Sequence, residues 1–144
     1  MKETKGIQFN LRGVSIDQFA TPFEPTTDNI EVNVSIPIKT NYQEHAIAVG
    51  ANIQFVEDGK VFIIAEVFCH YLIEQECWKR LSDSDSKDVV LPKEFINNLS
   101  GIAIGTVRGV LCAKTENTPF SKFFVPLVMI SPDNGVDLTI PKPE

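Results

Sequence analysis

Residues 46–71, AIAVGANIQFVEDGKVFIIAEVFCHY, decide the fold of this chain. Asp58 and Gly59 stand between two long runs of β-branched, aromatic and small residues. Asp-Gly is a preferred pair for a two-residue type I′ turn, because both turn positions need a positive φ. The stretch therefore predicts a long antiparallel hairpin.

A two-residue turn places Glu57 opposite Lys60 and fixes every pair beyond it. One face then packs on the core, through the pairs Phe55 with Phe62, Ile53 with Ile64, and Val49 with Phe68. The opposite face is also apolar on the second strand, at Val61, Ile63, Ala65, Val67, Cys69 and Tyr71, beside the small Ala46, Ala48 and Gly50 of the first. Because a sheet face open to water carries polar residues, we expect something other than water to cover part of this second face.

Two further strands precede the hairpin. Ile7, Phe9 and Leu11 alternate with polar residues and the alternation resumes at Val14 after Gly13, which predicts a strand with a bulge. A proline-containing loop at 20–29 follows, and residues 30–38 alternate as a second strand that Pro37 confines to an edge or an end.

The stretch 91–112, LPKEFINNLSGIAIGTVRGVLC, predicts a long helix from about Pro92 to Ala113. At 100° per residue one broad stripe faces the core, formed by Phe95, Leu99, Ile102, Ala103, Thr106 and Val110. Three glycines follow at four-residue spacing along the flank, and each costs a helix about 1 kcal/mol relative to alanine.

The glycine flank has two interpretations: a close contact inside this chain, or a subunit interface. Small residues at this spacing let two backbones approach closely, as in GxxxG helix pairs. We favour the interface, and assign it to Gly101, Ile104, Gly105, Arg108, Gly109 and Leu111.

Composition limits the remaining possibilities. We expect one domain over 1–144, with a core at about 5–132 and a tail at 133–144, in the α+β class with a four-stranded antiparallel sheet and one long helix packed on it. A net charge of −6 with scattered basic residues argues against nucleic-acid binding. No secretion signal and no apolar run of membrane-spanning length are evident, so we expect a cytoplasmic protein without membrane insertion, and its three cysteines to be reduced thiols.

Catalytic motifs are sparse. No phosphate-binding loop, dinucleotide-binding turn or nucleophile elbow occurs, and Cys69 and His70 point to opposite faces of their strand. The acidic loop at 82–88 lacks the glycine and the distal glutamate of an EF-hand, so we expect no metal and no cofactor. Glu66 is the one unusual carboxylate, since it falls on the predicted core face.

Aromatic and apolar residues outside the regular elements are plentiful. Any one of them could be plain core, but large apolar patches mark sites for proteins or peptides. We expect a client-binding surface at Phe23, Trp78, Phe120, Phe123, Phe124, Leu127 and Met129.

The order of elements resembles the SecB-like export chaperones, most strongly from Leu91 to Leu127, where GIAIGTVRG is followed by TPF and FVPLVMISP. The resemblance implies a dimer or tetramer that packs its long helices together. It also implies binding of non-native polypeptides without ATP, in a groove between the loop around Phe23 and the segment from Phe120 to Met129. The final IPKPE lacks the Cys/His zinc element of many export chaperones, so an antitoxin client is an alternative to an export client.

Three functions are therefore open. The leading hypothesis is an ATP-independent, SecB-like chaperone that binds extended apolar segments and forms a homo-oligomer. The first alternative is a non-catalytic scaffold subunit with one fixed protein partner. The second is a small-ligand binder or enzyme with a pocket near Glu66, His70 and Cys69.

Overall fold

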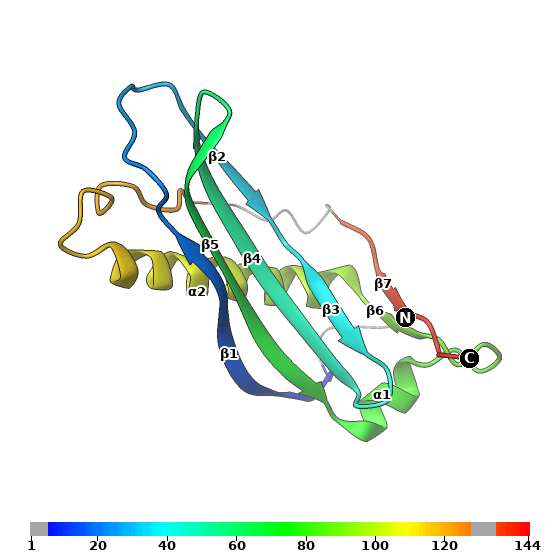
Figure 1. Cartoon of the computed structure of the whole chain (residues 1–144). Coiled ribbons are helices and arrows are strands. Elements are labelled where there is room, and N and C mark those ends of the chain that lie inside the picture. Colours follow the sequence, from blue (N-terminus) through cyan, green and yellow to red (C-terminus); the bar gives the residue numbers. More distant parts are fainter. Residues whose placement is uncertain (1–5, 128–134) are drawn as a thin grey trace.

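The computed structural model describes residues 6–127 and 135–144. The chain is α+β, with a long helix packed on one face of an antiparallel sheet (Figure 1). Its elements in chain order are β1 (Phe9–Ala20), β2 (Ile30–Ser35), β3 (Ile38–Asn41), β4 (Ala46–Glu57), β5 (Lys60–Ile73), α1 (Gln75–Leu81), β6 (Val89–Leu91), α2 (Lys93–Thr115) and β7 (Leu138–Ile140). The predicted fold class is confirmed.

The main sheet has the order β1-β5-β4-β2, and β3 also pairs with β4. β2 and β3 pair with successive lengths of β4, so together they occupy one edge of the sheet. The predicted strand at 30–38 is therefore divided at Ile36 and Pro37, where proline interrupts the ladder.

The hairpin register is correct at the turn and wrong beyond it. Glu57 pairs with Lys60 as predicted, and Asp58 and Gly59 both have positive φ. A bulge then follows: Val56 pairs with Val61 but Phe55 pairs with Ile63, so Phe62 is the extra residue. From there on every predicted pair is displaced by one residue.

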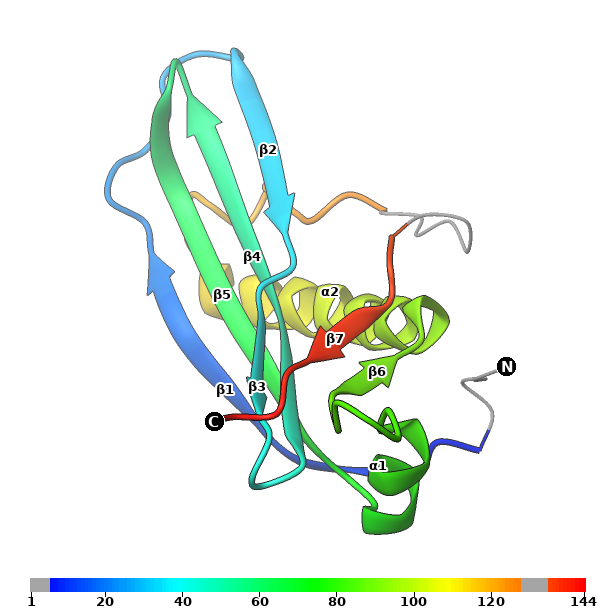
Figure 2. The same cartoon turned by 90° about the vertical axis from the view of Figure 1, so that its right-hand side faces the viewer.

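The displacement exchanges the two predicted faces of β5. Ile63, Ala65 and Val67 now lie on the same face as Val49 and Ile53, and all five are fully buried. This is the face that α2 covers (Figure 2). The expected cover over the second apolar face of β5 is therefore the helix. Ile64 and Glu66, predicted to face the core, lie on the open face and are half-buried.

Helix α2 presents a different stripe to the sheet from the predicted one. Phe95, Leu99 and Ala103 are buried as expected, but Ile102 is 48% exposed. Instead, the stripe continues through Ile104, Val107 and Leu111. Helix α2 is long and apolar enough to meet the length and composition test for a membrane span, a test that the core helix of a globular domain also meets.

The chain after the hairpin contains structure that the sequence patterns did not predict. Trp78 lies on the short helix α1. β7 pairs with β6 in a small second sheet, and Ile140 is buried in the core. The carboxylate of Asp137 accepts a hydrogen bond from the backbone N–H of Lys93, 2.9 Å away, at the start of α2. The expectation of a tail at 133–144 is thus wrong at 137–140.

Candidate functional site

Two of the predicted client-binding aromatics meet at the hairpin end of the sheet. Phe23 lies 6.0 Å from Phe62, and Phe123 lies 5.0 Å from Phe62 and 5.8 Å from Phe55 between ring centroids. The bulge supplies the centre of this cluster, because Phe62 is its extra residue. Phe23 and Phe123 remain half-buried, so each leaves part of its ring accessible.

The segment after α2 exposes two large apolar side chains. Phe124 is 73% exposed and Leu127 is 88% exposed, whereas Val125 between them is buried. Arg108 holds the segment to the helix: its guanidinium donates to the carbonyl oxygens of Val125 at 3.3 Å and Pro126 at 3.0 Å. These side chains are therefore presented on an anchored backbone.

The other predicted client residues have different positions. Trp78 is 3% exposed, with the His45 ring stacked at 4.7 Å and Tyr42 edge-on at 5.4 Å, so its prediction as a binding residue is wrong. Phe120 is partly buried against the core. Met129 lies outside the described residues.

The predicted interface residues on α2 divide into three groups. Ile104 and Leu111 are 4% and 1% exposed inside this chain, so they present no surface and we withdraw them from the interface. Arg108 binds the segment described above. Gly101, Gly105 and Gly109 are exposed, and a Cβ atom added at any of them would meet no atom of the described residues within 4 Å. Within the part of the chain that the structure describes, these glycines therefore make no close contact.

A row of apolar side chains on β1 is the largest feature that the sequence analysis missed. Phe9, Leu11, Val14 and Ile16 pair with buried residues of β5, so they lie on the helix side of the sheet. They are nevertheless 37%, 57%, 50% and 48% exposed. The sequence shows the alternation of β1. It does not show that α2 leaves these side chains exposed.

The same row continues onto the helix. The Phe9 ring lies 5.0 Å from that of Phe95, near the start of α2, and the Lys114 ammonium lies 6.0 Å from the ring of Phe19, near its end. These two contacts place the start of α2 near the start of β1 and the end of α2 near the end of β1, while the helix packs mainly on β4 and β5. We call the exposed apolar residues of both elements the β1–α2 surface: Phe9, Leu11, Val14, Ile16 and Ile102, with the flank of Gly101, Gly105 and Gly109.

No protein-family model matches this chain, and no curated protein matches it. Its function is therefore argued from its own surfaces.

The loop that carries Phe23 is held by one carboxylate. Glu57, 8% exposed, accepts hydrogen bonds from the Thr26 backbone N–H at 2.8 Å, the Thr27 backbone N–H at 2.6 Å and the Thr27 hydroxyl at 2.7 Å. These bonds, the Thr27 hydroxyl foremost, lower the pKa of Glu57 against the opposing effect of its partial burial. The loop is thus tied to the hairpin by an ionised group.

The residues of the proposed enzyme or ligand pocket do not form one site. Cys69 is buried on the helix side, where its thiol lies 3.6 Å from the Thr106 hydroxyl. His70 and Glu66 lie on the open face, and Glu66 accepts a hydrogen bond at 2.9 Å from Asn52. His70 lines a hollow on that face together with Arg12 and Lys39, and Glu66 does not line it.

Proposed function

We propose that this protein is an ATP-independent chaperone that binds extended apolar segments of non-native polypeptides and works as a homo-oligomer. The observation that carries the proposal is the pair Phe124 and Leu127, 73% and 88% exposed on a segment that Arg108 anchors to α2. Globular proteins expose scattered apolar residues, but an anchored apolar segment beside further half-exposed aromatics is typical of a polypeptide-binding surface.

The binding surface consists of this segment and the neighbouring aromatic cluster. A client in extended conformation places alternate side chains on one side, and these bury apolar area against Phe124, Leu127 and the accessible parts of Phe23 and Phe123. Arg108 already holds the backbone of the segment in place. Client binding therefore orders fewer groups, and the loss of conformational entropy on binding is smaller. No covalent step is involved.

The β1–α2 surface supplies the contact between subunits. β1 is an edge strand, and no described strand pairs with its outer side. Exposed apolar edge strands favour pairing with another chain, and the bare glycine flank lets a second helix approach closely. In this proposal the glycine positions and β1 mediate assembly, and the Phe124 segment binds clients.

The proposal is tested by light scattering with three unrelated chemically denatured proteins diluted into buffer without nucleotide. The chain should suppress aggregation of all three at a few subunits per client. The double variant Phe124→Ser/Leu127→Ser should lose most of this effect, because it removes the exposed apolar area. The variant Val136→Ser is the matched control, since Val136 is 81% exposed on another segment and its loss should change little.

The same assay distinguishes the scaffold alternative. A subunit with one fixed partner uses an equally apolar surface but has no general affinity for unfolded chains. Absence of suppression for all three clients, with the protein folded, would therefore exclude the chaperone proposal and favour a fixed partner. Equal suppression by the double variant and the wild type would show that the client site lies elsewhere.

A further inference from the structure

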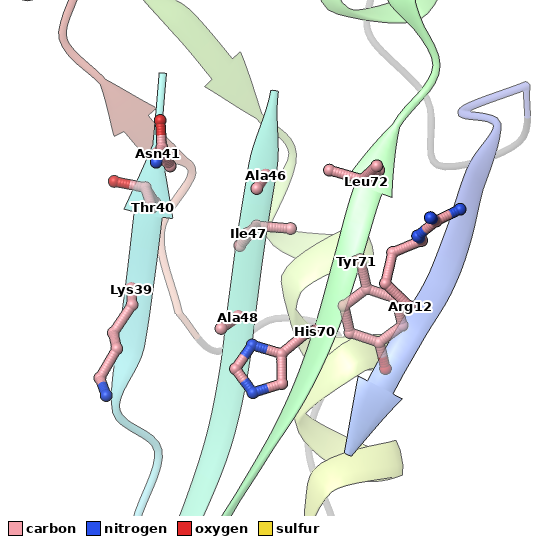
Figure 3. A pocket seen from close by; sticks show the side chains of 10 residues that line it. All are labelled: Arg12, Lys39, Thr40, Asn41, Ala46, Ile47, Ala48, His70, Tyr71 and Leu72. Carbon is pink, nitrogen blue, oxygen red and sulfur yellow. The ribbon is translucent and has the colours of Figure 1, made fainter. Parts of the chain in front are cut away.

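The open face of the main sheet contains a hollow of about 240 Å³ that the proposed function does not use (Figure 3). It arises because the side chains of β4 facing outward there are small. Ala48 lies between Lys39 of β3 and His70 of β5, and Ala46 lies between Asn41 and Leu72. The methyl groups form a floor, and the longer side chains on both sides form the walls.

A bulge in β1 adds a cation to this hollow. Leu11 pairs with Tyr71 and Gly13 pairs with His70, so Arg12 between them is the extra residue. Arg12 is exposed and lines the hollow (Figure 3). Among the described residues its guanidinium makes no hydrogen bond and no ion pair. Its donors are therefore available to a ligand.

A hydrogen bond fixes the orientation of the His70 ring at one wall of the hollow. The Ser15 hydroxyl donates to the Asp17 carboxylate at 2.6 Å and lies 2.8 Å from Nε2 of His70. Because Ser15 has one proton and gives it to Asp17, Nε2 carries the hydrogen in this pair. Nδ1 remains without a partner among the described residues.

The charges around the hollow favour an anion. Lys39 lies 3.5 Å from the Asp17 carboxylate and 4.2 Å above the Phe68 ring, so its charge is partly neutralised. The charge of Arg12 is not. The hollow therefore has a net positive charge, although the whole chain has a net charge of −6. Among anions, a carboxylate suits a guanidinium well, because the two groups form two parallel hydrogen bonds.

We infer that this hollow binds a small monocarboxylate with a short hydrocarbon body. The carboxylate binds Arg12, and the body lies over the methyl floor. The walls are mainly apolar, and the volume is below the roughly 300–1,000 Å³ of pockets for drug-sized ligands, so a ligand of modest size fits best. Since the hollow is shallow and open on one side, we expect dissociation constants in the millimolar range.

The test is a titration of the full chain with hexanoate, followed by two-dimensional amide NMR. Shifts should concentrate in 12–13, 39–41, 46–48 and 70–72. Hexanol, which has the body without the charge, and acetate, which has the charge without the body, should each bind at least tenfold more weakly than hexanoate. Arg12→Gln should weaken hexanoate binding at least tenfold, whereas Lys60→Gln, with the same loss of charge at the hairpin turn, should not. Ala48→Leu should fill the hollow and abolish binding.

Three results would overturn the inference. Equal binding of hexanol and hexanoate would show a merely apolar depression. Unchanged affinity in Arg12→Gln, a variant at an exposed position that leaves the core intact, would remove the proposed anion contact. Binding of a glutamate-rich peptide at micromolar concentration without detectable hexanoate binding would identify the face as a docking site for acidic polypeptides instead.

Discussion

At the scale of the residue, glycines in this chain have opposite roles that the sequence does not distinguish. A Cβ atom at Gly50 would lie 2.7 Å from the Val67 carbonyl oxygen and 2.8 Å from the Phe68 ring. At Gly105 it would meet nothing within 4 Å. Gly50 is therefore required by close packing inside the chain, whereas no contact with the described residues requires a glycine at position 105.

This contrast gives the first prediction. Gly50→Ala should destabilise the fold by about 1–3 kcal/mol, because the added methyl group overpacks the sheet. Gly105→Ala should stabilise the monomer by about 1 kcal/mol through helix propensity. Urea denaturation at a concentration low enough for the monomer measures both. A loss of stability at Gly105 would mean that its flank has a contact inside the chain after all.

Glu57 gives a second prediction at this scale. Hydrogen bonds from Thr27 and Thr26 lower its pKa, so the ionised form is favoured in the folded chain. The stabilisation by ionised Glu57 is therefore fully present above its ordinary pKa of 4.5, and it is lost as the pH falls through the lowered pKa of the folded chain. The loop at 20–29 should therefore loosen only below about pH 4.5.

Amide NMR checks this directly. The Thr26 and Thr27 amide signals should titrate together, with a midpoint below 4.5. In Glu57→Gln this titration should disappear, and the variant should be less stable than the wild type at pH 7, since a neutral amide accepts weaker hydrogen bonds. Asp17 and Asp83, whose pKa values are also lowered, are unchanged in the variant and serve as internal controls. A midpoint at or above 4.5 would contradict the anchoring role.

At the scale of the element, the sequence predicted what its local chemistry determines. The Asp58-Gly59 turn, the strands on both sides, the long helix after Pro92 and the edge position of Pro37 all follow from turn chemistry and periodicity. The bulge at Phe62 does not. Residues 61–65 of β5 are apolar without interruption. A shift of the pairing register by one residue therefore leaves the hydrophobic pattern unchanged, and the pattern cannot reveal the bulge.

The site was predicted less completely than the fold, for a related reason. Phe23, Phe123, Phe124 and Leu127 were identified as apolar residues in loops, and their exposure depends on which other segment covers them. Trp78 has the same chemistry but lies under His45 and Tyr42. The buried stripe of α2 was predicted wrongly because the helix is apolar on more than one side. Periodicity therefore could not decide between Ile102 and Ile104 for the core.

For the molecule as a whole, β1 and α2 leave an apolar area exposed beside the sheet, and we propose that a second copy covers it. The row from Phe9 to Ile16 is exposed on β1, and Phe9 contacts Phe95 near the start of α2. The glycine positions of α2 are exposed as well. Five large apolar side chains exposed between 37% and 57% stand along this surface. We propose that association buries these side chains and thereby gains hydrophobic free energy, and that close packing at the exposed glycines offsets their cost in helix propensity.

We propose that the chain assembles through the β1–α2 surface. Sedimentation velocity over a range of concentrations, on the wild type, Gly105→Leu and the control Gly105→Ala, tests it most directly. We predict a dimer or tetramer for the wild type, and a monomer with unchanged circular dichroism for Gly105→Leu, because the leucine side chain blocks the approach of the second helix. Leu11→Lys should give the same result from the β1 side. A wild type that remains monomeric, or an unchanged oligomer in both Gly105→Leu and Leu11→Lys, would contradict the claim.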